Sequence, residues 1–313
     1  MVREPVSIVV PVKNRATLVL RTLESIRQQT WRPLRVIVVD NASTDGTPGS
    51  VRAWAEKHAD DEFEVSVIEE STPGAAAARN AGLESVDTRL MMFFDSDDLM
   101  APRHVETIMR RFHAGDDPDL VFYRMEYHPV DGADRITKRP GRDLMTTHIA
   151  HGMLRTAAYA CETALARRAG GWNETLRGWD DLEFGSRLLM EARRRAYIPD
   201  VNVEVYAQVD SITGTEFTSR KGEWERALDA MEANFGKSRH RNREKWSRLV
   251  AYKRAILAAF YWREGAKEAG DALLEKALST PGLNSLQKAY LTLAYNYTAL
   301  GGRGAAVLAN LLL

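Results

Sequence analysis

Three carboxylates follow directly on a run of large apolar residues. Residues 90–94 are Leu-Met-Met-Phe-Phe, and Asp95, Asp97 and Asp98 come within the next four positions. Such a run predicts a strand buried on both faces. Ionised carboxylates are costly to bury unpaired, so we expect them where the strand leaves the core. In parallel α/β sheets this is the edge where ligands bind, and hard oxygen ligands suit Mg²⁺ or Mn²⁺. The residues also allow a helix start near Pro102, capped by Ser96 or Asp97.

The segments before this run predict an α/β fold. Residues 6–12 and 35–40 are β-branched and apolar, and they read as buried strands that end near Pro11 and on Asp40. A third strand is expected at 64–68, with helices at 17–29 and 51–57 between the strands. This alternation is typical of a Rossmann-like, mixed but mostly parallel sheet flanked by helices.

The later part of the chain predicts a change from strands to helices. Helices are expected at 103–112 and from 178 to about 195, strands at 120–127 and 201–209, and a largely helical stretch at 149–168. After residue 222 the pattern is helical throughout, at 224–235, 244–264, 267–279 and 284–300. We therefore expect a C-terminal all-helical appendage.

Composition excludes several classes of protein. The 313 residues contain 43 Lys and Arg and 43 Asp and Glu, so no overall charge points to nucleic acid. The single cysteine, Cys161, fits a reducing compartment, and neither a signal peptide nor a transmembrane segment is expected. We expect a cytoplasmic protein. A basic cluster at 237–245 suggests peripheral contact with the inner face of a membrane, or else a solvated segment between helices.

Five motifs follow one another along the chain. They are residues 7–11, residues 38–47, residues 74–80, the run ending in Asp95-Ser96-Asp97-Asp98, and Gly170-Gly171-Trp172-Asn173-Glu174 followed by 179–187. In this order they resemble glycosyltransferase family 2. The resemblance covers about residues 5–210 and implies a GT-A fold. It implies a catalytic domain at 1–213, with a nucleotide-sugar half at 1–99 and an acceptor half at 100–213. Residues 214–313 would then form a separate helical region.

The resemblance implies an inverting, metal-dependent transfer of sugar from a nucleoside-diphosphate sugar, with a UDP-sugar expected. The acceptor would be a hydroxyl group of a growing glycan or lipid-linked saccharide, as in polysaccharide biosynthesis. Asp95-Ser96-Asp97 would be the Asp-X-Asp (DXD) element, with Asp95 and Ser96 facing the donor and Asp97 on Mn²⁺ or Mg²⁺. Pro11, Asp40 and Arg79 would belong to the nucleotide pocket, although Asp40 could instead make only a local Asx-turn.

The acceptor half would supply the general base. Asp181 matches the family's base, while Asp180 departs from the usual glutamate; both could instead serve the helix dipole. Trp172 and Trp179 would stack on acceptor sugars, or else belong to the core. A third metal ligand is less clear, and Gln208 or Asp210 could provide it.

Two other functions remain open at this point. A nucleotidyltransferase would need a glycine-rich phosphate loop with a lysine after the first strand. The sequence Val12-Lys13-Asn14-Arg15-Ala16 contains no glycine. A non-catalytic sugar-binding or scaffold protein would not need both Asp97 and Asp181. The donor sugar, the acceptor, the linkage, the oligomeric state and the role of the C-terminal helices do not follow from the sequence.

Overall fold

The chain forms two compact units, each assembled from separate segments. The computed structural model describes residues 4–130, 132–208 and 216–302. Within these, the sheet unit comprises residues 4–139, 154–175 and 191–208, and the helical unit comprises 140–153, 176–190 and 216–302. Segments 140–153 and 176–190 thus pack with the C-terminal helices, although they lie within the predicted domain 1–213. The predicted functional boundaries at residues 99 and 213 stay predictions.

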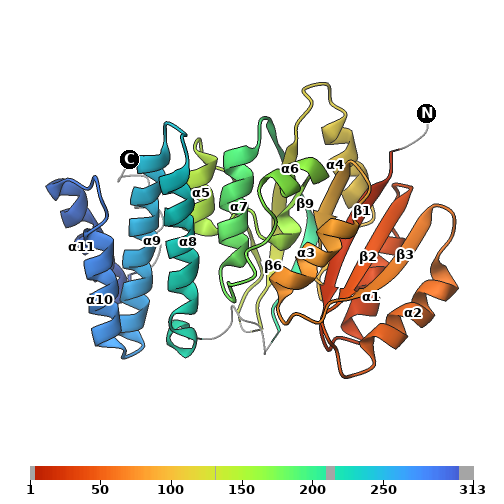
Figure 1. The fold of residues 1–313 in the computed structure, drawn as a ribbon, viewed down its shortest axis with the longest axis horizontal. Helices are drawn as coiled ribbons and strands as arrows, with labels where there is room; N and C mark the ends of the chain where they lie inside the picture. Colours follow the sequence, from red (N-terminus) through yellow and green to blue (C-terminus); the bar gives the residue numbers. More distant parts are fainter. Residues whose placement is uncertain (1–3, 131, 209–215, 303–313) are drawn as a thin grey trace. The chain divides into compact units, whose positions relative to one another are not determined.

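The first half of the sheet is parallel. Strands β1 (Val6–Val12), β2 (Leu34–Asp40), β3 (Phe63–Glu69) and β4 (Leu90–Phe93) lie in the order β3-β2-β1-β4. The first three lie side by side in Figure 1. Every residue of β1 and β4 is buried, as expected for strands covered on both faces. The predicted parallel strands are confirmed.

The second half of the sheet is mixed. Strand β8 (Tyr159–Glu162) is antiparallel to β4 and to β6 (Leu120–His128). Strand β9 (Arg195–Tyr206) runs parallel to β6, β5 (Leu99–Met100) pairs with β9, and β7 (Arg135–Ile136) pairs with β6. The mixed α/β fold class is confirmed.

Helices cover the sheet through narrow apolar stripes. These helices are α1 (Leu18–Arg27), α2 (Thr47–His58), α3 (Ala75–Ser85), α4 (His104–Phe112) and α6 (Thr163–Arg168), with the 3₁₀ turn η1 (Thr156–Ala158). In α1, Val19, Leu23 and Ile26 are buried at helical spacing. In α3, a Cβ atom at Gly82 would clash with the Val9 side chain, so only glycine lets this helix lie so close to β1.

The helical unit is organised around α9 (Arg243–Arg263). This helix packs against α5 (Leu144–His151), α8 (Glu223–Lys237), α10 (Lys267–Leu278) and α11 (Ser285–Ala299) (Figure 1). The unit also contains the 3₁₀ turn η3 (Phe217–Arg220) and all of α7 (Asp180–Glu191) except its last residue. The predicted C-terminal helices are confirmed. Among the described residues, no helix is both long and apolar enough to cross a membrane.

Three sequence-based expectations were wrong. Residues 149–168 are not largely helical, because Tyr159–Glu162 forms β8 between two other strands, where sheet packing overrides an alanine-rich pattern. The last long strand begins at Arg195 rather than at 201. Neither Ser96 nor Asp97 caps the next helix, since α4 begins at His104 with Arg103 at its N-cap.

Candidate functional site

The sheet unit brings the predicted donor residues to one edge. Strands β2, β1 and β4 are neighbours and parallel, so their carboxyl ends lie at the same edge. Asp40 is the last residue of β2, Pro11 is the last but one of β1, and Asp95 follows β4 by two positions. Two strand spacings separate the Asp40 and Asp95 backbones, or about 10 Å. This edge, with Ser96 and Asp97, is called the donor edge below.

Asp40 has one carboxylate oxygen to spare. The residue is only 3% exposed, and its Oδ2 accepts the Ser43 N–H at 3.0 Å. Its Oδ1 is buried and has no hydrogen-bond partner among the described residues. The Asx-turn alternative therefore accounts for one oxygen only. An unsatisfied buried acceptor costs about 1–3 kcal/mol, and a ligand N–H would remove that penalty.

Pro11 lies where the sheet can tolerate a missing N–H. Strand β4 pairs with β1 only as far as Val9, whose carbonyl accepts the Phe94 N–H at 2.9 Å. Because backbone groups alternate sides along a strand, Pro11 faces the same side as Val9, beyond the end of β4. Strand β1 continues one residue past Pro11, to Val12. On the side that β4 occupies next to Val9, β4 thus does not pair with the backbone of Pro11.

Two asparagines that the sequence analysis missed shape the loops at this edge. Asn41 accepts the Gly74 N–H at 2.8 Å and donates to the carbonyls of Glu70 and Thr72. It thereby fixes Gly74, whose φ of 132° lies in a region that strongly favours glycine, at the start of α3. Asn14 accepts the Thr44 N–H at 2.8 Å, which joins the loops after β1 and β2. Their position directly beyond two strands was the available signal.

Arg79 holds the Asp95 side chain through an ion pair. Its Nη2 lies 3.0 Å from Asp95 Oδ1, and the arginine side chain is 9% exposed against 34% for the aspartate. The guanidinium carbon lies 4.3 Å from the centre of the Trp172 ring. Trp172 is itself 3% exposed and meets Phe93 edge-on at 5.3 Å. This burial favours the core interpretation of Trp172, which supports Arg79 instead of presenting an open face to a sugar.

The three carboxylates after β4 have different surroundings. Asp98 is 2% exposed; its Oδ1 accepts the Tyr206 N–H at 3.2 Å, and its carbonyl accepts the Thr22 hydroxyl. Burial, together with the charges of Asp95 and Asp97, raises the pKa of Asp98 well above its usual range. Asp98 therefore anchors the loop. Asp95 and Asp97 are half-buried, while Ser96 between them is buried.

This set of donor atoms fits a divalent cation. Carboxylate oxygens are the ligands that Mg²⁺ and Mn²⁺ prefer, and half-buried Asp95 and Asp97 offer such oxygens beside the buried Asp98. Of the two residues considered as a third ligand, Gln208 donates to the Tyr206 carbonyl at 3.3 Å. Asp210 lies outside the described residues.

Of the candidate acceptor residues, Trp179 and Asp180 lie in the helical unit with Asp181, whereas Trp172 lies in the sheet unit. Asp180 and Asp181 open α7, and Trp179, directly before them, has a φ of 53°, which is unusual for a bulky residue. Trp179 packs at 5.2 Å against Trp224, and the Lys253 ammonium lies 4.9 Å above its ring. Trp179 remains half-buried, so part of its surface is open. Such strained backbone is frequent at functional sites.

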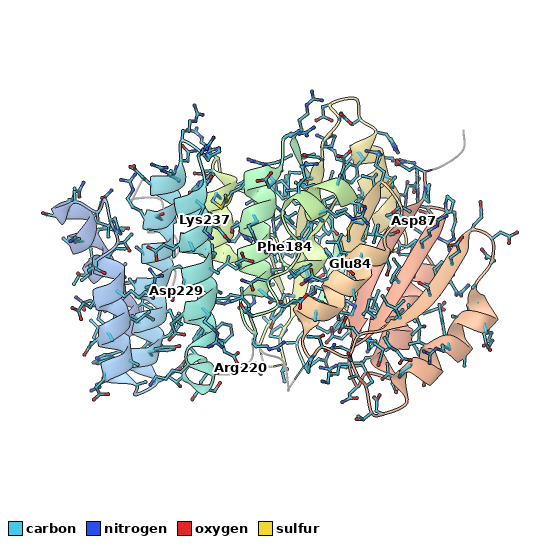
Figure 2. The ribbon with its side chains drawn as sticks, viewed as in Figure 1. Glu84, Asp87, Phe184, Arg220, Asp229 and Lys237 are labelled. Atoms are coloured by element: carbon cyan, nitrogen blue, oxygen red, sulfur yellow. The ribbon has the colours of Figure 1, made fainter. Side chains whose placement is uncertain are left out.

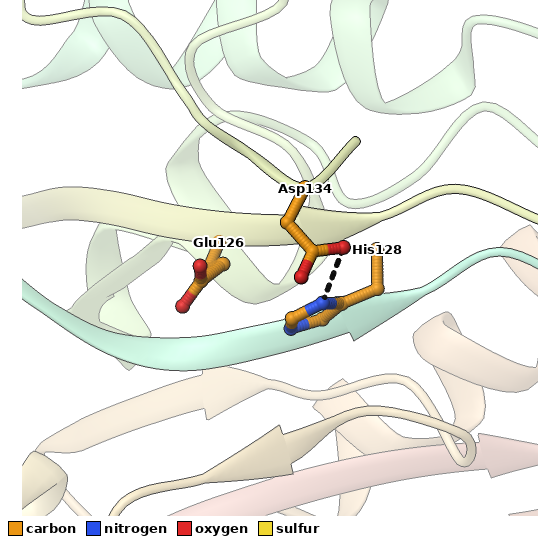
Figure 3. A group of neighbouring side chains, drawn as sticks. All are labelled: Glu126, His128 and Asp134. Atoms are coloured by element: carbon orange, nitrogen blue, oxygen red, sulfur yellow. Dashed lines mark ion pairs between the residues drawn. The ribbon is translucent and has the colours of Figure 1, made fainter. Parts of the chain in front are cut away.

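A separate group of potential metal ligands lies on the β6–β7 hairpin. Glu126, His128 and Asp134 each place a ligand atom within 4.8 Å of the others (Figure 3). His128 Nδ1 lies 2.9 Å from Asp134 Oδ1, and its ring stacks on Tyr206 at 4.6 Å. The ion pair links His128 to Asp134 within the hairpin, and the ring stacking links the hairpin to β9.

The predicted membrane-contact cluster is exposed. Lys237 ends α8, and the turn to α9 carries further cations; the exposed basic residues are Lys237, Arg239, His240, Arg241 and Arg243. Lys245 differs, because it is half-buried and pairs with Asp143 at 2.8 Å. The exposure is compatible with both of the interpretations given above.

Comparison with known sequences places the first half of the chain in one family. The model of "Glycosyl transferase family 2" matches residues 7–169. The EpsH protein of Bacillus subtilis (strain 168) is 36% identical over 116 residues, which are 37% of this chain and 32% of EpsH. The validoxylamine A glucosyltransferase of Streptomyces hygroscopicus subsp. limoneus is 27% identical over 219 residues, which cover 58% of this chain and 47% of that protein. The chain thus spans about a third to a half of these relatives.

Comparison with solved structures extends the similarity to the whole fold. Residues 1–349 of S. aureus TarS in complex with UDP match with a TM-score of 0.67 at 15% identity, over 94% of this chain and 92% of that one. The mannosyltransferase PcManGT of Pyrobaculum calidifontis, in complex with GDP-Man and Mn²⁺, matches with a TM-score of 0.56 at 24% identity, over 99% and 87%. These matches confirm the GT-A fold. The family model, which matches more than half of the chain, shows that this chain belongs to glycosyl transferase family 2.

Proposed function

We propose that the chain transfers a sugar from a nucleoside-diphosphate sugar, in particular a UDP-sugar, to a hydroxyl group, with inversion and with help from Mn²⁺ or Mg²⁺. The observation that carries this proposal is the donor edge. There, a buried carboxylate with a spare acceptor oxygen, Asp40, and the Asp95-Ser96-Asp97 loop lie at the ends of the two parallel strands that flank β1. The solved structures of TarS with UDP and of PcManGT with GDP-Man and Mn²⁺ support the choice of ligands.

The spare oxygen of Asp40 would recognise the base. A carboxylate can accept the imide N–H of uracil, and Oδ1 is the buried atom without a partner. Asp95, oriented by Arg79, would accept hydrogen bonds from ribose hydroxyls. The separation of about 10 Å between the two residues suits the length of a nucleoside. Pro11 and Ser96 would line the space between them.

Asp97 would hold the metal ion. A divalent cation on the diphosphate neutralises the charge that develops on the leaving nucleoside diphosphate. The half-buried position of Asp97 leaves its carboxylate accessible, while buried Asp98 fixes the loop. The chain's contribution is thus a loop whose two more exposed carboxylates are set in place before the donor arrives.

Asp181 would act as the general base. Its carboxylate takes the proton of the acceptor hydroxyl, while the acceptor oxygen bonds to the anomeric carbon. The bond from that carbon to the diphosphate oxygen breaks, and the nucleoside diphosphate leaves. Attack from the face opposite the leaving group inverts the anomeric centre. Asp180 and the open part of Trp179 would contact the acceptor, a saccharide or lipid-linked saccharide, with 237–245 near anionic lipid.

Release of nucleoside diphosphate tests this function. The protein would be incubated with UDP-glucose, UDP-N-acetylglucosamine, UDP-galactose and GDP-mannose, with and without Mn²⁺. Even without an acceptor, water can slowly replace the hydroxyl group. We expect Mn²⁺-dependent release from at least one UDP-sugar, and loss of that release in Asp181→Asn. Release that is equal in the variant, or absent with every donor in the presence of Mn²⁺, would contradict the proposal.

A further inference from the structure

Glu183 is a buried carboxylate in the first turn of α7, two residues after Asp181. It is 1% exposed, and its backbone N–H donates to the Trp179 carbonyl at 3.0 Å. The Arg187 guanidinium donates hydrogen bonds to both carboxylate oxygens of Glu183, from Nε to Oε1 at 2.7 Å and from Nη2 to Oε2 at 2.6 Å. A buried charge requires such partners, because an uncompensated one is strongly destabilising. Glu183 thus fixes α7 internally.

A third hydrogen bond to Glu183 comes from a different helix. Asn234, near the end of α8, donates its Nδ2–H to Glu183 Oε1 at 2.7 Å. Figure 2 labels Asp229 and Lys237 on α8, and Asn234 lies between these two residues in the sequence. On α7 it labels Phe184, the residue after Glu183. Both helices follow the segment 7–169 that the family model matches. The link between α8 and α7 is therefore internal to the helical unit and lies outside the segment that the family model matches.

The residue between Asp181 and Glu183 is held from a second side. His148 on α5 is completely buried, and its Nε2 lies 2.9 Å from the Leu182 carbonyl oxygen. Burial lowers the pKa of His148 to about 4, so the ring is neutral near pH 7 and can donate its Nε2–H to that carbonyl. Lys253, which lies over the Trp179 ring, also disfavours a charge on His148.

We propose that Glu183, Asn234 and His148 are positioning residues that hold the first turn of α7 so that the Asp181 carboxylate is presented to the acceptor hydroxyl. This inference rests on the proposed function. It gives α8, which belongs to the predicted C-terminal helical region, a role in positioning Asp181 together with α5. A displacement of about 1 Å in a reacting group can lower the rate about 100-fold, so a side chain that never touches substrate can matter to turnover.

The first test is Asn234→Ala, with Asn296→Ala as its matched control. Asn296 is an exposed asparagine on α11, so the control makes the same substitution on a helix of the same unit. We expect Asn234→Ala to lower kcat for Mn²⁺-dependent nucleoside-diphosphate release about 10-fold or more, with the Kd for UDP unchanged. The control should keep both values.

A second measurement does not depend on activity. Amide hydrogen exchange would be followed in a peptide that spans residues 179–190. Asn234→Ala should speed exchange in the first turn of α7, because one of the contacts that hold it is lost. Asn296→Ala should leave this peptide unchanged. This readout still works if the donor is wrong, so failure here and failure of the proposed function can be told apart.

A longer side chain with the same amide group provides the rescue. Asn234→Gln keeps an N–H donor for Glu183 and leaves the Glu183–Arg187 ion pair in place. We expect this variant to recover kcat and slow exchange relative to Asn234→Ala. The proposal is overturned if Asn234→Ala keeps kcat within about twofold of the unmodified protein, or if kcat and UDP affinity fall together. Unchanged exchange in residues 179–190 also overturns it.

Discussion

The donor edge and the first turn of α7 hold their carboxylates by different means. At the donor edge, Asp40 and Asp95 follow strands, so the main-chain ladder of β2, β1 and β4 places them. In α7, the turn that carries Asp181 is held by side chains from two other helices, Asn234 and His148. The first arrangement depends on backbone pairing along the length of parallel strands. The second depends on individual distant side chains, so we expect it to be the easier of the two to disturb.

Asp181→Asn should give the largest difference between the two regions, with a strong effect on kcat and almost none on UDP binding. The amide cannot take a proton from the acceptor, so kcat should fall about 10²- to 10⁴-fold. The donor edge is untouched, and the Kd for UDP with Mn²⁺ should stay within about twofold of the unmodified protein. Steady-state assays and isothermal titration measure these values. If UDP affinity falls as much as kcat, Asp181 is not acting as a base alone.

Asp97→Asn should show the reverse pattern. Losing a charged oxygen ligand should lower turnover about 100-fold and remove most of the effect of Mn²⁺ on UDP binding. Asp98→Asn is unsuitable as a control, because Asp98 anchors the loop through Tyr206. Asp87→Asn, at an exposed aspartate on the same unit, is the better one. Titration of UDP with and without Mn²⁺ compares the variants, and a full Mn²⁺ effect in Asp97→Asn would exclude the assignment.

Asp40→Ala should weaken donor binding without changing the chemistry. Loss of one charge-assisted hydrogen bond to the base corresponds to about 1.5–3 kcal/mol, or roughly a 10- to 100-fold rise in Kd for UDP. The kcat at saturating donor should change little. Uridine binding should weaken in parallel, because the contact is to the base. An unchanged Kd for uridine would mean that Asp40 does not contact the base and serves only its local turn.

The last prediction concerns the pH dependence of the free energy of unfolding, through His148. Its pKa is about 4 in the folded protein and about 6.5 when unfolded, so the unfolded chain binds more protons between these values. The free energy of unfolding that comes from keeping this ring neutral is fully present above pH 6.5. It decreases by about 2–3 kcal/mol as the pH drops toward 4. His148→Gln keeps a donor for Leu182 but does not titrate. Urea unfolding at pH 7 and pH 4.5 should show a shallower loss in the variant, and identical losses would refute this effect.

The sequence predicted the strands that lead to Asp40 and Asp95 well and the contacts around Asp181 poorly, for a physical reason. Apolar runs that end in Asp40 and Asp95 signal strands and their ends directly, because burial on both faces demands continuous apolar residues. The Glu183–Asn234 contact joins residues that are 51 positions apart, and no periodicity encodes it. Residues 159–162 form a strand instead of the expected helix for a similar reason, because their pairing with β4 and β6 decides their conformation.

Thermal unfolding with a panel of nucleotides tests the central claim most directly, since a ligand that binds the native state raises Tm by mass action. The account predicts that UDP and UDP-sugars raise Tm only weakly alone and clearly more with Mn²⁺, and that Asp97→Asn abolishes the added shift. If no nucleoside diphosphate raises Tm even with Mn²⁺, the donor edge does not bind a nucleotide sugar and the account is wrong.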